Sequence, residues 1–237
     1  MKSISFKLFG AAALIAAALT TSAQNSETRK VSDFHSVGVA GYFNVHIKID
    51  GQESLKLSGP ADVLKEIETE VKEKGTLEIH FREGYKRENN NQRVDVYISA
   101  KSLSSLSVAG AVKLDVEGAL TGEKVKISTA GVANITTAVK ATSVEASSSG
   151  SSDVTLSGTA NSAKYSLSGA GKLNATELKS EEVKISIAGA GGASVFANKT
   201  ISASIAGSGH IKYRGNATIE HYSSAGSGSI TKEKGEE

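Results

Sequence analysis

The sequence predicts an all-β protein folded as a right-handed parallel β-helix, a β-solenoid with coils of about 19 residues. The first observation is a Ser-x-x-Gly motif that recurs through the C-terminal half. The seven motifs begin at Ser107, Ser128, Ser147, Ser166, Ser186, Ser204 and Ser223. Their glycines are 21, 19, 19, 20, 18 and 19 residues apart. This period is too long for a heptad and too short for a propeller blade, but it is typical of one solenoid coil.

The second observation is an alternation of apolar and polar residues around each repeat glycine. With that glycine as position zero, positions −4, −2 and +4 are mostly apolar, and the odd positions carry Lys, Asp, Asn, Ser and Thr. In the coil of Gly169 the apolar positions hold Tyr165, Leu167 and Leu173. Such alternation predicts two short strands per coil, each with one buried face. The glycine marks a bend where φ is positive, or where neighbouring coils approach too closely for a side chain.

The N-terminus is predicted to be a signal peptide, residues 1–23, followed by a single domain, residues 24–237. A basic start precedes the apolar run Leu8–Leu19, and small residues lead to a cleavage site after Ala23. The run is shorter than the ~20 apolar residues that cross a bilayer, so we expect no membrane span. We therefore expect the chain to be exported to the periplasm, the cell envelope or the medium.

An eighth glycine, Gly41, belongs to the same pattern. Apolar residues flank it with the spacing of the repeats, namely Phe34, Val37, Val39, Phe43, Val45 and Ile47. The first coil is thus predicted to begin at about residue 34. An insertion of about residues 52–100 separates it from the regular repeats, at about residues 101–231.

Inside the insertion we expect several different elements. Gly59 and Pro60 precede Ala61–Val71, which is predicted to be a short helix or turn. Leu77–Phe81 and Val94–Ile98 alternate as strands do. Between these strands, Glu83–Arg93 is charged and rich in Asn, as expected of an exposed loop.

Position −3 of the repeats is serine in all seven motifs, and position −1 is always alanine or serine. The residues at position −1 are Ala109, Ala130, Ser149, Ser168, Ala188, Ala206 and Ala225. By parity both positions point away from the core, so they form one nearly uncharged strip, here called the Ser/Ala strip. Exposed surfaces normally carry Lys and Glu, so we expect this strip to be covered. The insertion or stacked corners, a second subunit of a homo-oligomer, or a ligand are the alternatives.

The C-terminal end is predicted to be a solvated cap. Position −6 becomes Glu220, position −2 becomes Ser224, and the tail after Lys232 is charged. A polar last coil protects the open strand edges of a solenoid, so we expect no open-ended polymer.

The residues that usually carry chemistry do not gather into a motif. The chain has no cysteine, which excludes disulfides and thiolate metal sites. Its five histidines lack metal-ligand spacing, and a net charge of +2 gives no nucleic-acid signature. Asp115 and Asp153 lie in non-adjacent coils at different positions, with Asn134 in the coil between them. We therefore expect no catalytic residues, no cofactor and no bound metal.

The spacing around Gly41, the segment from Gly59 to Val71, the pair Leu77 and Ile79, and the repeated Ser-x-x-Gly-x-Gly together resemble the head GIN domain. This resemblance covers nearly the whole mature chain. The family consists of secreted bacterial proteins described as putative auto-transporter adhesins. It implies a β-helical fold and an exported protein, and it brings no catalytic residues.

We therefore expect an exported, non-enzymatic binding or adhesin-like envelope protein that acts through its repeat surface. Its partner would be a cell-surface, glycan or protein ligand. Two alternatives stay open: a polysaccharide-cleaving β-helix enzyme, and a purely structural periplasmic protein.

Overall fold

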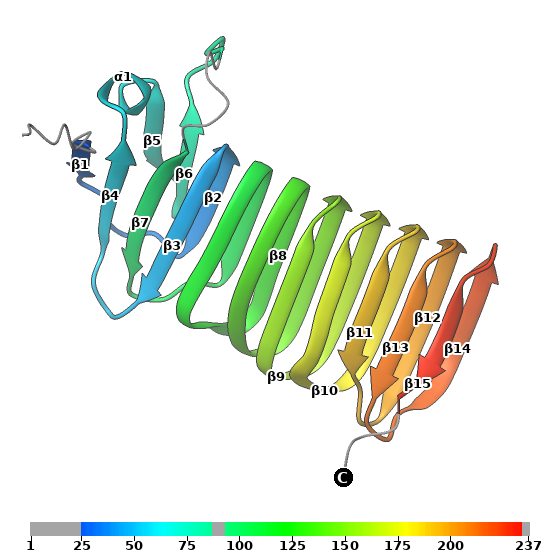
Figure 1. The fold of residues 1–237 in the computed structure, drawn as a ribbon. Helices are drawn as coiled ribbons and strands as arrows, with labels where there is room; N and C mark the ends of the chain where they lie inside the picture. Colours follow the sequence, from blue (N-terminus) through cyan, green and yellow to red (C-terminus); the bar gives the residue numbers. More distant parts are fainter. Residues whose placement is uncertain (1–24, 87–92, 234–237) are drawn as a thin grey trace, which may run out of the picture.

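The computed structural model describes residues 25–86 and 93–233, and the predicted signal peptide lies outside these residues. The described chain forms an elongated β-solenoid with two facing layers of strands (Figure 1). We name as sheet A the layer whose strands lead into the repeat glycines, and as sheet B the layer whose strands follow them. Each coil gives one strand to each layer.

The strands follow one another along each sheet in spatial rather than chain order. Sheet B contains β1 (Asn25–Arg29), β4 (Ser54–Gly59), β7 (Val94–Ala100), β3 (Phe43–Ile49), β11 (Gly192–Phe196), β13 (His210–Arg214) and β15 (Ser229–Lys232). Sheet A contains β5 (Ile67–Lys72), β6 (Thr76–Phe81), β2 (Ser36–Gly41), β12 (Thr200–Gly207) and β14 (Thr218–Ala225). Three long strands turn the corners and belong to both sheets: β8 (Ser105–Gly150), β9 (Asp153–Gly169) and β10 (Lys172–Gly189). A short helix, α1 (Ala61–Leu64), follows β4.

Successive coils are parallel, and their repeat glycines stack in register. The paired glycines are Gly41 with Gly110, Gly150 with Gly169, Gly169 with Gly189, and Gly189 with Gly207. About five regular turns of some 19 residues separate Gly131 from Gly226. The predicted parallel β-solenoid is confirmed.

The repeat glycines are required for two reasons at once. Their φ angles lie between 101° and 145°, a region that L side chains rarely adopt. A Cβ atom built on Gly150 would also lie 2.4 Å from the carbonyl oxygen of Gly131. That oxygen accepts a hydrogen bond of 2.9 Å from the backbone N–H of Ser151, so it is held in place. Both parts of the prediction for these glycines are confirmed.

The core lies between the two sheets and is filled by the predicted apolar positions. Tyr165, Leu167 and Leu173 are each at most 5% exposed. In the later coils, glycine at position +2 makes room for an isoleucine of the coil before. A Cβ on Gly209, for example, would lie 2.7 Å from Cγ2 of Ile187. The alternation of the sequence thus assigned the buried face correctly.

The insertion adds a coil to the solenoid. β6 pairs in parallel with β2, and β7 pairs in parallel with β3, so the two strands form a coil on the outer side of the first one. The predicted helix Ala61–Val71 is wrong beyond Leu64, because Ile67–Lys72 is a strand antiparallel to β6. Its β-branched residues alternate with Glu and Lys, which favours a half-buried strand over a helix. Part of the predicted loop Glu83–Arg93 lies outside the described residues.

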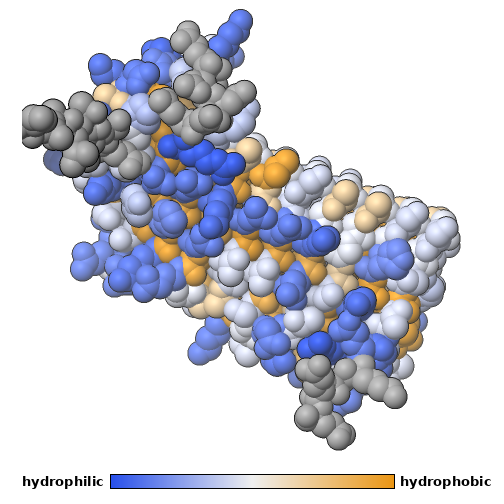
Figure 2. All heavy atoms as spheres, in the orientation of Figure 1, coloured by the Kyte–Doolittle hydropathy of each residue, from blue (hydrophilic) through white to orange (hydrophobic). Residues whose placement is uncertain are grey.

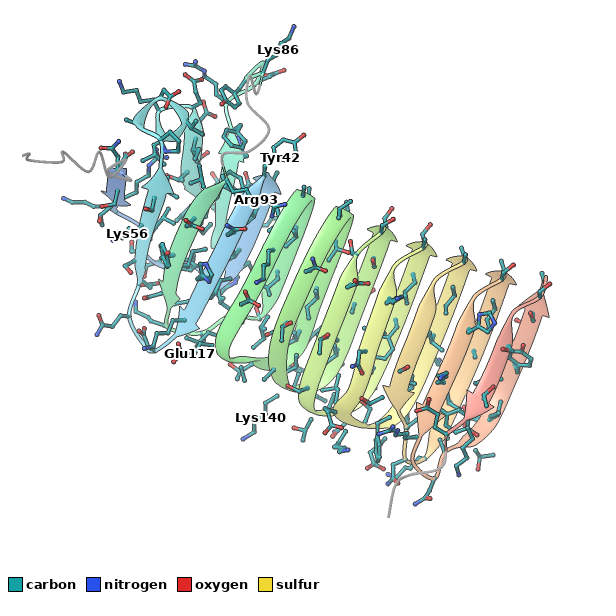
Figure 3. The ribbon with its side chains drawn as sticks, in the orientation of Figure 1. Tyr42, Lys56, Lys86, Arg93, Glu117 and Lys140 are labelled. Carbon is teal, nitrogen blue, oxygen red and sulfur yellow. The ribbon has the colours of Figure 1, made fainter. Side chains whose placement is uncertain are left out.

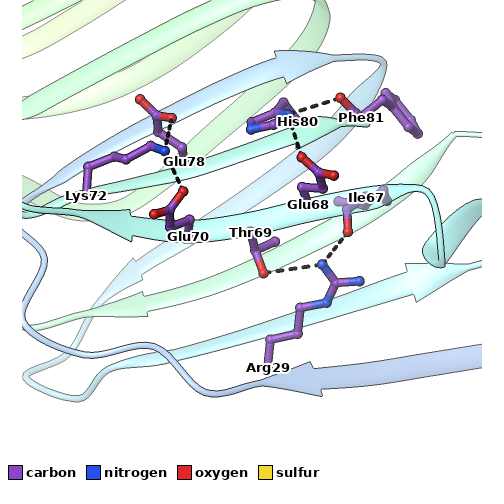
Figure 4. Close-up of polar contacts among 9 residues, drawn as sticks. All are labelled: Arg29, Ile67, Glu68, Thr69, Glu70, Lys72, Glu78, His80 and Phe81. Carbon is purple, nitrogen blue, oxygen red and sulfur yellow. Dashed lines mark hydrogen bonds and ion pairs between the residues drawn. The ribbon is translucent and has the colours of Figure 1, made fainter. Parts of the chain in front are cut away.

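Antiparallel strands close the N-terminal end of the solenoid. In sheet B, β4 pairs antiparallel with β7 and β1 pairs antiparallel with β4. The Arg29 guanidinium on β1 donates to the carbonyls of Ile67 and Leu64, at 2.5 and 3.0 Å, and to Oγ1 of Thr69 at 3.2 Å. Figure 4 shows this arginine reaching β5 of the opposite layer. The clamp joins the outermost strands of both sheets.

The C-terminal end is open and polar. Every residue of β14 is exposed, including Tyr222 and Ser224 at core positions. Glu233, just beyond β15, forms ion pairs with Lys212 at 3.1 Å and Arg214 at 3.2 Å. The last described coil is thus solvated, as expected. The absence of a polymer stays a prediction.

Candidate interaction surfaces

The Ser/Ala strip lies on the outer face of sheet A. Its serines stack in register from coil to coil, as Ser166 with Ser186 and Ser186 with Ser204. All seven serines are exposed or half-buried. At the C-terminal end, Oγ of Ser223 donates to Oγ of Ser204 at 3.2 Å. The strip therefore presents a regular ladder of hydroxyl and methyl groups to solvent.

The insertion does not cover this strip, so that expectation is wrong. The insertion extends the solenoid lengthwise at the N-terminal end, away from the repeat coils (Figure 1). It does so because its strands satisfy their backbone hydrogen bonds against β2 and β3. A second subunit or a ligand as the cover stays a prediction.

A shallow groove of about 510 Å³ runs over the strip. Its walls come from several successive coils, from Ser128 to Ala206. The described residues that line it are Ser, Thr, Ala, Leu and Ile, and none of them is charged. The groove is therefore a wide, uncharged surface with hydroxyl groups on an apolar base.

Beside it on sheet A lies a second groove of about 460 Å³ with mixed charges. Nζ of Lys124 lies 2.6 Å from Oε2 of Glu145, and Nζ of Lys164 lies 3.9 Å from Oε1 of the same carboxylate. The hydrogen bond from Lys124 is the main cause that lowers the pKa of Glu145. Positive and negative side chains pair between coils here, so this half of the sheet carries no strong field of one sign.

The acidic residues considered as a catalytic pair are not brought together. Asp115 lies opposite His46 in the register of sheet B, whereas Asp153 lies opposite Asn134 and Lys172. Within residues 25–86 and 93–233 there is no group of three His, Cys, Asp or Glu side chains that could hold a metal ion. No helix in the same ranges is long and apolar enough to cross a membrane.

Two titratable groups that the sequence did not single out stabilise the fold. The Glu53 carboxylate accepts hydrogen bonds from the backbone N–H of Phe34 at 3.2 Å and pairs with Lys101 Nζ at 2.6 Å. Lys101 is the main cause that lowers the pKa of Glu53. Burial raises the pKa of Tyr165 far above its usual value, and a hydrogen bond with Ser180 opposes this in part. Both groups are distant in sequence from the partners they contact, so no local pattern revealed them.

The protein-family comparison decides the family. Residues 33–217 match the model described as "Putative auto-transporter adhesin, head GIN domain". The chain belongs to the head GIN domain family. The resemblance noted in the sequence is thereby confirmed, and membership of an adhesin family points to a location outside the cytoplasm. No curated protein matches this head GIN chain.

Solved structures support the fold of this head GIN chain. A putative adhesin of Bacteroides fragilis NCTC 9343 is similar at 27% identity and a TM-score of 0.81, over 88% of this chain and 96% of that one. A putative lipid binding protein of Parabacteroides distasonis ATCC 8503 has 22% identity and a TM-score of 0.69, over 89% and 97%. A putative adhesin of Parabacteroides merdae ATCC 43184 has 19% identity and a TM-score of 0.66, over 89% and 96%. The last two likenesses show the shared fold alone.

Proposed function

We propose that this head GIN chain is an exported, non-enzymatic, adhesin-like binding protein that contacts its partner through the outer faces of its solenoid. The observation that carries the proposal is the uncovered Ser/Ala strip, in a chain that belongs to a family described as adhesins. The basic and apolar pattern of residues 1–23 supports export. The partner is a cell-surface glycan or protein, or a second copy of the chain.

The chemistry of the strip suits a broad, close contact. Serine and alanine lose little side-chain entropy when they are covered, in contrast to lysine and glutamate. No charge has to be desolvated in the groove, because no described lining residue is charged. The regular stacking of Ser166, Ser186 and Ser204 gives a partner the same hydroxyl at each coil. A flat or repetitive partner surface would fit this spacing.

The test places two large charges on the strip. The double variant Ser186→Arg with Ser204→Arg should reduce retention of labelled protein on bacterial and epithelial cell surfaces about tenfold, by steric block and desolvation. A matched control, Thr159→Arg with Asn161→Arg, adds the same charge at exposed positions near the opposite bend of a coil. It should leave retention unchanged.

Sedimentation of the same proteins identifies a self-partner. A dimer or trimer that the strip variant alone dissociates would make the second copy the occupant. Equal retention of the strip variant and its control would refute the role of the strip. Release of reducing sugar that disappears on carboxylate substitution would instead establish the enzyme alternative.

A further inference from the structure

The first coils of sheet B carry a second groove, on the face opposite the Ser/Ala strip. It has a volume of about 520 Å³. Its lining includes Ser54, Lys56, Tyr97, Ser99, His46, Lys48, Asp115 and Glu117. Figure 2 shows strongly hydrophilic side chains gathered over β4, β7 and β3, and a paler surface over the later coils. Lys56 and Glu117, labelled in Figure 3, come from different strands of this groove.

Four of the lining residues form one row across four neighbouring strands. Lys56 on β4 pairs with Tyr97 on β7, Tyr97 with His46 on β3, and His46 with Asp115 on β8. Strands lie about 4.8 Å apart, so the row spans roughly 14 Å across the sheet. All four side chains are exposed or half-buried on the outer face of the sheet.

An aromatic pair lies at the middle of the row. The rings of His46 and Tyr97 are stacked, with centroids 5.1 Å apart and planes inclined by 19°. Tyr97 is 44% exposed, so the pair is open to solvent while each ring holds the other in place. A preorganised, exposed aromatic pair offers apolar contact area at little cost in side-chain entropy.

The charges around the aromatic pair cancel. Lys48 and Lys56 face Asp115 and Glu117, and Nζ of Lys48 lies 3.7 Å from Oε1 of Glu117. Such a site has strong hydrogen-bond donors and acceptors but no net charge to select an anion or a cation. A neutral ligand with many hydroxyl groups, which both donate and accept, satisfies these groups best.

The same position of the following coils continues the row with uncharged polar side chains. These residues are Thr136, Thr155, Asn174 and Ser194, the last three in register with one another. All four are exposed or half-buried. A chain of sugar rings that lies across the strands, along the solenoid axis, would find a hydroxyl or amide group at each coil.

We infer that this groove is a binding site for a neutral, linear glycan. The His46–Tyr97 pair contacts the apolar face of one sugar ring, and the flanking lysines and carboxylates bind its hydroxyl groups. The hydroxyl and amide row extends the site to further rings. This inference rests on the proposed binding function, since both assign a ligand to the outer face of the solenoid.

The test is calorimetric titration of the described domain as it is secreted, with cellohexaose, xylohexaose, mannohexaose and maltohexaose as probes. The intact protein should bind at least one of them, and Tyr97→Ala should raise its Kd at least about tenfold. Tyr97→Phe keeps the ring and should change Kd by no more than about threefold. Tyr42→Ala removes a similarly exposed ring, 45% exposed, at the glycine corner, and should leave Kd unchanged.

Two further variants separate this site from the strip. Thr155→Arg should weaken hexasaccharide binding because it interrupts the row, and the strip variant Ser186→Arg with Ser204→Arg should not. Absence of affinity of the folded protein for all four probes would overturn the inference. Equal effects of Tyr97→Ala and Tyr42→Ala would also overturn it. If cell-surface retention persists and still depends on the strip in either case, the proposed function stands while the glycan site falls.

Discussion

A single methyl group on the glycine ladder tests the architecture most directly. In Gly169→Ala the new Cβ would lie 2.4 Å from the carbonyl oxygen of Gly150, at a φ of 115°. That oxygen accepts a hydrogen bond of 3.0 Å from the backbone N–H of Ala170, so it cannot turn away without losing the bond. The substitution therefore combines backbone strain with a displaced carbonyl.

The expected cost follows from these two effects. A side chain at an unfavourable φ costs about 1–3 kcal/mol, and the lost hydrogen bond costs about 1 kcal/mol. Alanine lowers the entropy of the unfolded chain, which offsets about 0.4–1 kcal/mol. We therefore expect Gly169→Ala to lower the free energy of unfolding by about 2–3 kcal/mol, measured by urea denaturation followed by circular dichroism.

Gly192→Ala is the matched control. The nearest atom to a Cβ there is the carbonyl oxygen of His210 at 3.9 Å, and the φ of Gly192 is not in the positive region. This variant should be neutral, or more stable by up to about 1 kcal/mol. Equal destabilisation at Gly169 and Gly192 would refute the argument that contact between coils, rather than loss of glycine as such, fixes the ladder.

Three further substitutions test individual side chains. Thr129→Val should raise the free energy of unfolding by about 1 kcal/mol in urea, because the buried hydroxyl of Thr129 has no hydrogen-bond partner. Glu53 has a pKa lowered mainly by Lys101, so its contribution is present above the ordinary value of 4.5 and is lost as the pH falls through the folded pKa. On acidification, Glu53→Gln should therefore lose less melting temperature than the wild type. Burial raises the pKa of Tyr165 above 10.0, so its contribution is lost as the pH rises above that value, and Tyr165→Phe should flatten the alkaline decline in melting temperature.

The repeats could be predicted from the sequence because each coil repeats the same physical problem. A glycine recurs where a Cβ would strike the coil before it, and apolar residues recur at the positions that face the core. Gly150 and Leu167 illustrate the two rules. Local periodicity sufficed because each coil pairs only with its neighbours in the chain.

The insertion could not be predicted in the same way, because its strands pair out of chain order. Nothing local indicates that Val94–Ala100 lies beside Phe43–Ile49, or that Ser54–Gly59 then pairs antiparallel on the far side. The strand Ile67–Lys72 was missed because a preceding proline favoured a helix start there. The groove with Tyr97 and His46 was missed for the same reason, since the two residues are neighbours only after this long-range pairing.

This difference in predictability follows a difference in what the two regions can recognise. Seven coils with serine at one position give a partner the same contact seven times, which supplies area but little discrimination. The insertion instead brings Tyr97 and Lys56 beside His46, and so places aromatic, cationic and anionic side chains in one row. Because these strands extend the same sheet B, the distinctive row continues directly into the repeated one. A long ligand would then be identified at the N-terminal coils and held along the uniform coils that follow.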